Sequence, residues 1–195
     1  MKSKKLDRSF FAQPTLEVAK ELLGKYLVLK QNGNLLSGKI VETEAYIGID
    51  DPASHSYGRV TLRNQIMYGP PGYTYIYFIY GNYYCLNFVT EKEGFPAAVL
   101  IRALEPIDGI KIMQENRKIK DINNLTNGPG KLCQAWGIDK NFNACDLTLN
   151  LLFVEDRGEK VKKIGNSERI GIYRGLDKKW RFYIMNNSFV SKIRS

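Results

Sequence analysis

The chain has 195 residues, enough for one well-buried domain and short for two. Its 29 Lys and Arg residues outnumber its 20 Asp and Glu residues, and the net charge of +9 favours a polyanionic partner, nucleic acid before an anionic membrane surface. A small protein that is merely rich in lysine is the alternative. No window approaches the roughly 18 apolar residues of a membrane span, and the basic start MKSKK lacks the apolar core of a signal peptide, so we expect a soluble cytoplasmic protein without membrane contact.

A helix, a strand and a turn are expected before the first long strand. Thr15 can cap a helix that runs to Leu23, and Gly24 can end it. A short strand is predicted over 26–29. The sequence QNGN at 31–34 is typical of a turn.

The strand predicted over 39–46 carries the first candidate for chemistry. Its alternation places Ile40, Glu42, Glu44 and Tyr46 on one face. Glu44 therefore projects beside an aromatic ring, and partial desolvation raises the basicity of a carboxylate, as a general base requires. A solvated strand glutamate without a catalytic role is the alternative.

Residues 48–72 form a long segment rich in Gly, Pro, Asp, Ser and Asn, which predicts an ordered loop. Loops of this length are usually functional or disordered. This one contains four side chains suited to binding: His55, Arg59, Arg63 and Asn64.

Two strands, over 72–79 and 83–90, are expected to form a tyrosine-rich hairpin. With a two-residue turn, Tyr77 and Asn87 point to opposite faces of the sheet. With a three-residue loop they share one face, and Tyr80 stands at the apex. Spacing leaves both registers open. An exposed apical tyrosine on a basic protein suits base stacking, whereas cross-strand aromatic packing is the alternative.

The next predicted strand, over 97–104, is apolar except for Arg102. Because arginine is rarely buried without a partner, Arg102 is expected to meet a carboxylate or a phosphate. Glu44 and Glu105 are the expected carboxylates, and a purely structural ion pair is an equal alternative.

Helices are expected over 106–118 and 128–136, and strands over 169–173 and 180–185. The second helix starts with the sequence GPGK, in which backbone N–H groups and Lys131 could contact a phosphate. An ordinary helix start with proline at the first position is the alternative.

The cysteine and histidine content argues against a metal site. Cys85, Cys133 and Cys145 lack CxxC spacing and lie in apolar segments, which favours reduced thiols. His55 is the only histidine, so a zinc site with several histidine ligands is excluded. We expect neither a metal nor a cofactor.

These elements predict an α+β protein with a single domain over 1–195. Its architecture is expected to be a mainly antiparallel, curved β-sheet with flanking helices and a protruding β-hairpin. Residues 1–10 are expected to form a flexible N-terminal segment.

Six blocks of sequence together resemble one known family. They are IVETEAYIG at 40–48, DDPASHS at 50–56, RNQIMYGPPGYTYIYFIYG at 63–81, YCLN at 84–87, VLIRALEP at 99–106 and GPGKLCQA at 128–135. In their order and their residues, these blocks are similar to the alkyladenine DNA glycosylases, the 3-methyladenine DNA glycosylases of mammals and many bacteria. The resemblance covers most of the chain and does not extend to helix-hairpin-helix glycosylases.

The resemblance implies a monofunctional hydrolase of base excision repair. Such an enzyme acts as a monomer on double-stranded DNA that contains damaged purines, and it needs no cofactor. It flips an alkylated or deaminated purine out of the duplex and hydrolyses the N-glycosidic bond, leaving an abasic site. A non-catalytic binder of damaged DNA is the alternative, as is a bifunctional glycosylase/lyase with a lysine nucleophile.

The resemblance also assigns roles to residues. Glu44 matches the general base that activates water, Arg102 matches an arginine that helps to hold this water, and Ile172 matches a residue that offers it a backbone carbonyl. Four residues match the pocket of the flipped base: Tyr46, His55, Tyr77 and Asn87. Among them, Asn87 matches the residue that discriminates against guanine through its exocyclic amine.

The remaining roles concern the duplex. Tyr80 matches the side chain that enters the minor groove and fills the gap left by the flipped nucleotide. Lys131 and Lys140 match basic residues near the DNA backbone. Arg63 and Arg59 are expected to contact the backbone as well, although the sequence YGRV at 57–60 departs from the family pattern. The hairpin tip YGNYY departs from the YGMHY of many family members, so Tyr83 receives no role from the resemblance.

Overall fold

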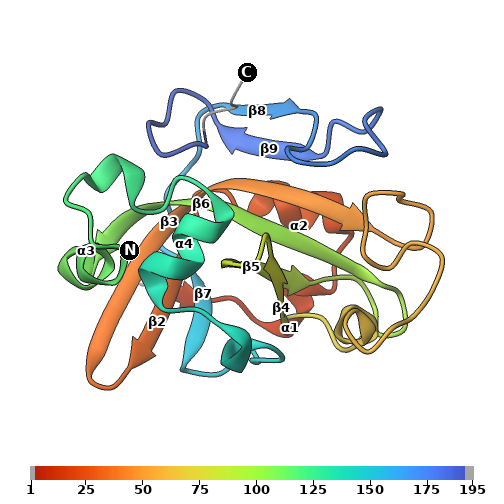
Figure 1. Cartoon of the computed structure of the whole chain (residues 1–195), viewed down its shortest axis with the longest axis horizontal. Helices are drawn as coiled ribbons and strands as arrows, with labels where there is room; N and C mark the ends of the chain where they lie inside the picture. The colour runs from red at the N-terminus through yellow and green to blue at the C-terminus, as the bar shows by residue number, and fades with distance from the viewer. Residues whose placement is uncertain (1–2, 192–195) are drawn as a thin grey trace.

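A nine-stranded antiparallel sheet organises residues 3–191, the part of the chain that the computed structural model describes (Figure 1). Its strands are β1 Lys4–Lys5, β2 Tyr26–Gln31, β3 Asn34–Ile47, β4 Thr74–Ile79, β5 Tyr83–Val89, β6 Ala97–Asp108, β7 Leu152–Asp156, β8 Ile164–Ser167 and β9 Arg181–Ile184. The strand order is β1-β7-β2-β3-β6-β5-β4, and β9 pairs with both β3 and β8. The sheet and its helices confirm a single α+β domain.

Helices pack against the long central strands. The α-helices are α1 Arg8–Phe11, α2 Thr15–Glu21, α3 Ile110–Arg117 and α4 Pro129–Trp136, and the short 3-10 helices are η1 Gln65–Tyr68, η2 Ile122–Asn124 and η3 Lys140–Phe142. In Figure 1, α2 runs behind β3 and β6, whereas α4 lies in front of β5 and β6. The buried side chains of α2 and α4 join those of the central strands in the main hydrophobic core.

Two β-bulges decide which residues of β3 and β6 face the core. Val41 is an extra residue on β3 between the pairs Ile40–Leu104 and Glu42–Ala103, and Arg102 is an extra residue on β6. Each bulge interrupts the period-two alternation of its strand. The prediction that Ile40 shares a face with Glu42 is therefore wrong, since Ile40 turns into the main core.

The hairpin of β4 and β5 has the three-residue loop. Ile79 pairs with Tyr83 and Tyr77 pairs with Cys85, so this register is the one that puts Tyr77 and Asn87 on one face. Tyr80 begins the loop with a left-handed φ of 53° and is 74% exposed. The loop thus leaves an aromatic side chain in solvent at the tip.

Tyr83 packs against the first turn of α4. A Cβ added at Gly130 would lie 2.9 Å from ring atoms of Tyr83, closer than side-chain carbons approach one another. Glycine at this position thus lets the start of β5, next to the hairpin loop, dock on the helix, and Tyr83 acquires a structural role that its sequence context did not indicate.

Replacing Gly130 with alanine should lower the free energy of unfolding by about 1–3 kcal/mol, because the new methyl group overlaps the Tyr83 ring. Urea denaturation measures this loss. Gly128→Ala is the matched control, since its added carbon would meet nothing closer than 3.7 Å. Adding Tyr83→Ala to Gly130→Ala should recover most of the loss, and a loss that persists in the double variant contradicts the contact.

Several predicted elements differ from the structure. Pro106 does not open a helix, because β6 continues to Asp108 and α3 starts at Ile110. Residues 169–173 form a loop rather than a strand. Thr15 was expected to cap α2, but the N-cap residue is Pro14. The hydroxyl of Thr15 donates to Glu91 instead.

The N-terminal segment adds one strand and one helix to the sheet region. β1 pairs with β7 through Lys4 and Lys5, and the Asp7 carboxylate caps α1 by accepting from the backbone N–H of Phe10. Arg8 then donates to the Asp146 carboxylate at 2.6 Å. Residues before Ser3 lie outside the described part of the chain.

Candidate active site

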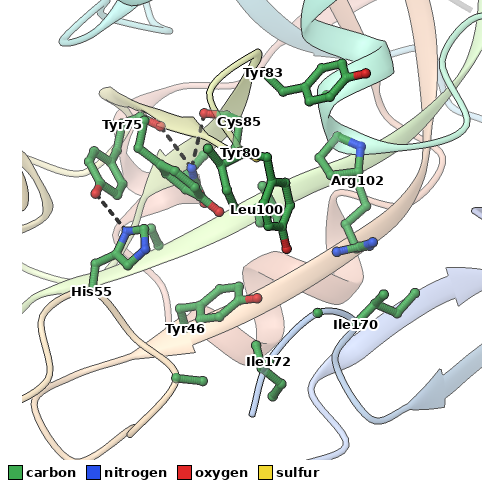
Figure 2. Close-up of a pocket in the computed structure, with 18 of the residues that line it drawn as sticks. Tyr46, His55, Tyr75, Tyr80, Tyr83, Cys85, Leu100, Arg102, Ile170 and Ile172 are labelled. Carbon is green, nitrogen blue, oxygen red and sulfur yellow. Dashed lines mark hydrogen bonds between the residues drawn. The ribbon is translucent and has the colours of Figure 1, made fainter. Parts of the chain in front are cut away.

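A cavity of about 810 Å³ opens between the hairpin, the central strands, the start of α4 and the loop over 168–175 (Figure 2). Eight residues singled out by the sequence line it: Tyr46, His55, Tyr77, Tyr80, Asn87, Arg102, Lys131 and Ile172. In Figure 2, Tyr46 and Arg102 point from β3 and β6 toward the same space. The fold thus brings together residues that are far apart in the sequence.

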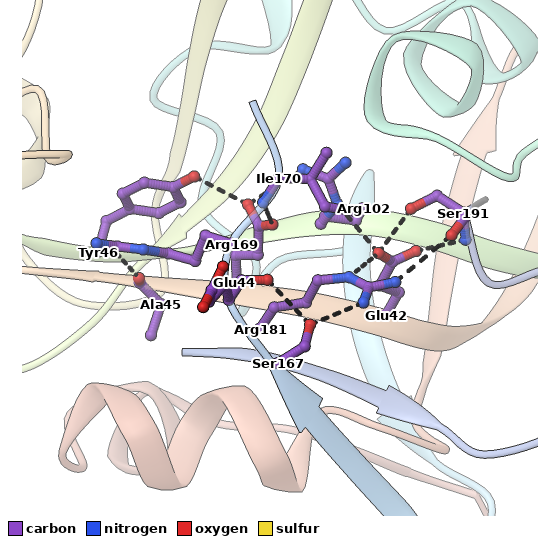
Figure 3. Close-up of polar contacts among 11 residues, drawn as sticks. Glu42, Glu44, Ala45, Tyr46, Arg102, Ser167, Arg169, Ile170, Arg181 and Ser191 are labelled. Atoms are coloured by element: carbon purple, nitrogen blue, oxygen red, sulfur yellow. Dashed lines mark hydrogen bonds and ion pairs between the residues drawn. The ribbon is translucent and has the colours of Figure 1, made fainter. Parts of the chain in front are cut away.

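Glu44 lies at the wall of this cavity and is fully buried. Its Oε2 accepts hydrogen bonds from the Tyr46 hydroxyl at 2.8 Å and from Arg102 Nη1 at 3.1 Å, and its Oε1 accepts one from the backbone N–H of Ile170 at 2.7 Å (Figure 3). All three donors belong to residues that line the cavity. A carboxylate has about four lone-pair sites, so one remains for a further donor such as water.

The surroundings of Glu44 keep its donors in fixed protonation states. Burial and the nearby Glu44 charge raise the pKa of Tyr46 well above its usual value, so its hydroxyl stays protonated and donates. The pKa of Arg102 is raised despite its burial, because Glu44 and Glu42 stabilise its charge. Arg102 pairs with these two carboxylates and not with Glu105, which instead contacts Lys39.

Aromatic side chains form the opposite wall. His55 contacts the edge of Tyr77 with ring centroids 4.5 Å apart, and its Nδ1 lies 2.9 Å from the Tyr75 hydroxyl. Partial burial and the Arg63 charge lower the pKa of His55 to about 4. The imidazole is therefore uncharged near pH 7 and does not repel a positively charged ligand in the cavity.

Two asparagines hold this wall in place. The amide group of Asn64 donates to the backbone carbonyls of His55 at 2.7 Å and Arg59 at 2.9 Å, which fixes the loop that carries His55. The amide group of Asn87 donates to the carbonyl of Tyr75 at 3.0 Å. Asn87 therefore presents a rigid side chain to the cavity.

Comparison with known proteins agrees with this arrangement. The family model described as Methylpurine-DNA glycosylase matches residues 9–188. The chain belongs to the methylpurine-DNA glycosylase family. It is a DNA repair glycosylase, a hydrolase of the N-glycosidic bond of the monofunctional type, and damaged DNA is its substrate. The family resemblance inferred from the sequence blocks is confirmed.

Relatives with the name "Putative 3-methyladenine DNA glycosylase" align over almost the whole chain. The relative from Alkaliphilus oremlandii (strain OhILAs) is 50% identical over 200 residues, which cover 96% of this chain and 99% of the relative. That from Methanocella arvoryzae is 50% identical over 192 residues, covering 96% of each chain. A relative from Clostridium acetobutylicum is 48% identical over 202 residues, covering 97% of this chain and 98% of its own.

A buried ion pair ties two walls of the glycosylase cavity together. Asp51, in the loop that carries His55, accepts from Arg169 Nη1 at 2.5 Å and Nη2 at 2.8 Å, and both side chains are 0% exposed. Arg169 also donates to the Ala45 carbonyl and lies 4.7 Å from the centre of the Tyr46 ring. The pair thus holds the loop over 168–175 against the end of β3.

The four basic residues assigned to DNA contacts differ in position. Lys131 lines the cavity and its Nζ donates to Asn127 at 2.7 Å. Arg63 lies 5.3 Å from the centre of the Tyr77 ring. Arg59 and Lys140 are exposed and do not line the cavity.

Sequence reasoning missed several groups of this glycosylase site. The Ile170 amide carries no sequence signal, because every residue except proline has a backbone N–H. Tyr75 receives no role from the sequence, yet its hydroxyl lies 2.9 Å from His55 Nδ1. Asp51 lies in the run DDPASHS, but no local sequence signal indicates its pair with Arg169, which follows 118 residues later.

Within residues 3–191, no group of three or more His, Cys, Asp or Glu side chains is placed to hold a metal ion. The three cysteines are free thiols, and burial raises the pKa of Cys85. No helix in this part of the glycosylase is long and apolar enough to cross a bilayer.

Proposed function

We propose that this glycosylase flips an alkylated or deaminated purine nucleotide out of duplex DNA into the aromatic cavity and hydrolyses its N-glycosidic bond with a water activated by Glu44. The buried Glu44 carboxylate, held by three donors at the wall of the cavity, carries the proposal. A base inside a duplex is inaccessible to such a group, so extrusion must precede the chemistry.

The chemical step follows from the position of Glu44. Its free lone-pair site accepts one proton from water while the water oxygen bonds to the anomeric carbon of the sugar. The glycosidic bond breaks, and its electron pair leaves with the base. Purines alkylated at N3 or N7 carry a positive charge, which this electron pair neutralises, so they depart without a general acid. Arg102 and the backbone carbonyl of Ile172 are proposed to orient the water.

Binding of the extruded base uses the aromatic walls. Tyr46, His55 and Tyr77 line the cavity and offer ring surfaces for stacking. A cationic base gains about 0.5–2 kcal/mol over an aromatic face. The neutral state of His55 supports this preference, because a protonated imidazole would repel the same base.

Exclusion of normal guanine is proposed to rest on Asn87. Its amide nitrogen is committed to the backbone carbonyl of Tyr75 at 3.0 Å, so the side chain cannot swing away. Guanine carries an exocyclic amine at C2, a position at which adenine and hypoxanthine carry only hydrogen. A rigid side chain beside that position opposes guanine by steric contact, and only a guanine that carries the positive charge of N7 alkylation gains the cation–π attraction that offsets this contact.

The duplex is proposed to meet the hairpin tip and a basic surface. Tyr80 is 74% exposed and would fill the gap left by the extruded nucleotide. The proposed contacts to the DNA backbone come from Lys131, Lys140, Arg63 and Arg59. Because one chain supplies every residue assigned to the pocket and the wedge, we propose a monomer, and light scattering of the purified protein tests it. Its proposed place of action is the cytoplasm.

An excision assay tests the function as a whole. Duplexes that carry 7-methylguanine, 3-methyladenine, hypoxanthine or ethenoadenine are incubated with the protein, and free base and abasic sites are quantified. The proposal expects release of at least one damaged base in equal amount with abasic sites. Borohydride should trap no covalent complex, since only an imine intermediate with a lysine is trapped. Absence of free base from all four duplexes would sink the proposal.

Tyr80→Ser should weaken the capture of a lesion in duplex DNA by roughly 5- to 150-fold, the equivalent of a lost stacking contact of about 1–3 kcal/mol. Fluorescence of 2-aminopurine next to the lesion measures extrusion. Phe78→Ser is the matched control, because Phe78 is also an exposed hairpin aromatic but does not line the cavity. Unchanged extrusion in Tyr80→Ser contradicts the wedge.

A further inference from the structure

A second buried carboxylate, Glu42, lies two residues before Glu44 and is not used in the proposed mechanism. It is 0% exposed and points to the same side of β3 as Glu44. Its Oε1 accepts from Arg181 Nε at 2.7 Å and from Arg102 Nε at 3.1 Å. The backbone N–H of Ser191 donates to its Oε2 at 2.7 Å.

These contacts join Glu42 to Glu44 in one buried chain of alternating charge. The order is Arg181, Glu42, Arg102 and Glu44, and Arg102 uses Nε for one carboxylate and Nη1 for the other (Figure 3). Arg102 and Arg181 are 7% and 3% exposed, so water screens this chain little. A change of charge at one end is therefore felt at the other.

We infer that Glu42 tunes the proton affinity of Glu44 through Arg102, as a positioning residue that shares the arginine with the general base. The inference rests on the proposed role of Glu44. Without the charge of Glu42, the two arginines face Glu44 with less compensation, and Glu44 binds a proton more weakly. Without the charge of Arg181, Glu42 competes more strongly for Arg102, and Glu44 binds a proton more tightly.

Other groups around the two carboxylates come from every neighbouring element. The ionisable side chains near Glu44, besides Arg102, include Arg169, which is charged, and Tyr46, Tyr77 and Cys85, whose raised pKa values keep them neutral. Around Glu42, the hydroxyl of Ser191 donates to Oε1 at 2.6 Å, and Arg181 Nη1 donates to the Ser167 hydroxyl at 2.9 Å. None of these groups lies between the two carboxylates as Arg102 does.

The pH dependence of single-turnover excision tests the inference, with 7-methylguanine in duplex DNA as substrate. Glu42→Gln should move the acid limb of the profile by about 1 pH unit to lower pH. Arg181→Met should move it to higher pH by a similar amount. Both substitutions disturb the same buried cluster, so a purely structural role would lower activity without opposite shifts. Shifts in one direction, or no shift in either variant, overturn the inference.

Two further sets of variants keep the test decisive. Arg181→Lys retains the charge and should keep the acid limb at the wild-type position, so the pair of Arg181 variants decides the question even if Glu42→Gln does not fold. Glu155→Gln and Arg157→Met are matched controls from a separate ion pair at 2.8 Å, and neither should move the limb. If the wild-type protein excised no base at all, this result would instead refute the proposed function, before any variant is compared.

Discussion

Replacing Glu44 with glutamine should reduce single-turnover excision by roughly 10²–10⁴-fold, the usual contribution of a general base. Glutamine keeps the shape of the side chain but cannot take a proton from water. Binding to a lesion duplex should remain close to that of the wild type, because Glu44 lies behind Tyr46 and Arg102 in the cavity wall. Rapid quench of excision and fluorescence anisotropy of binding separate the two effects.

The control for this experiment is Glu17→Gln. Glu17 is an exposed glutamate that pairs with Lys20 on the surface of α2, far from the cavity lining in the fold. Its substitution should change neither excision nor binding. Wild-type excision by Glu44→Gln would remove Glu44 from the mechanism, whereas loss of binding and excision together would reassign it to the structure of the pocket.

Asp51→Asn should lower the free energy of unfolding by about 3–5 kcal/mol, the cost of leaving one partner of a buried ion pair uncompensated. The side chains of Asp51 and Arg169 are both 0% exposed, so water cannot solvate the Arg169 charge that the substitution leaves without its partner. Excision should fall as well, because the loop that carries the Ile170 amide depends on Arg169. Urea denaturation measures the stability, and excision is measured below the onset of unfolding.

Lys20→Gln provides the comparison for Asp51→Asn. It breaks the pair with Glu17. The side chains of Lys20 and Glu17 are 43% and 54% exposed, and such surface pairs contribute little to stability. The urea midpoint should therefore stay at the wild-type value. A loss of less than about 1 kcal/mol in Asp51→Asn would mean that the buried pair is replaceable and that another contact holds the loop.

The buried charges at the cavity wall cost stability. Glu42, Glu44 and Arg102 would be replaceable by apolar side chains in a core that had only to be stable. Their desolvation is compensated by hydrogen bonds among side chains of β3, β6 and β9 and from the backbone amides of Ile170 and Ser191. The bulge at Arg102 is one reason why a single arginine reaches both carboxylates. The proposed chemistry gives a reason to keep them.

Elements with local signals could be predicted from the sequence. The helix from Thr15 follows from its apolar periodicity, the helix from Pro129 from the proline at its start, and the strands of the hairpin from the turn residues between them. The six sequence blocks also identified the family, because long runs of unusual residues are specific. Candidate residues such as Glu44 and Arg102 could be named on the same basis.

The way in which these residues meet could not be predicted from local signals. The hairpin register depends on the length of its loop, which spacing left open. The bulges at Val41 and Arg102 and the pair of Asp51 with Arg169 depend on contacts between segments far apart in the chain. A slip of one residue moves every side chain of a strand to the other face of the sheet, and sequence periodicity does not reveal such a slip. The Ile170 amide depends on the path of the backbone alone, so the packing of the loop against β3 had to be known before Glu44 could be given its third donor.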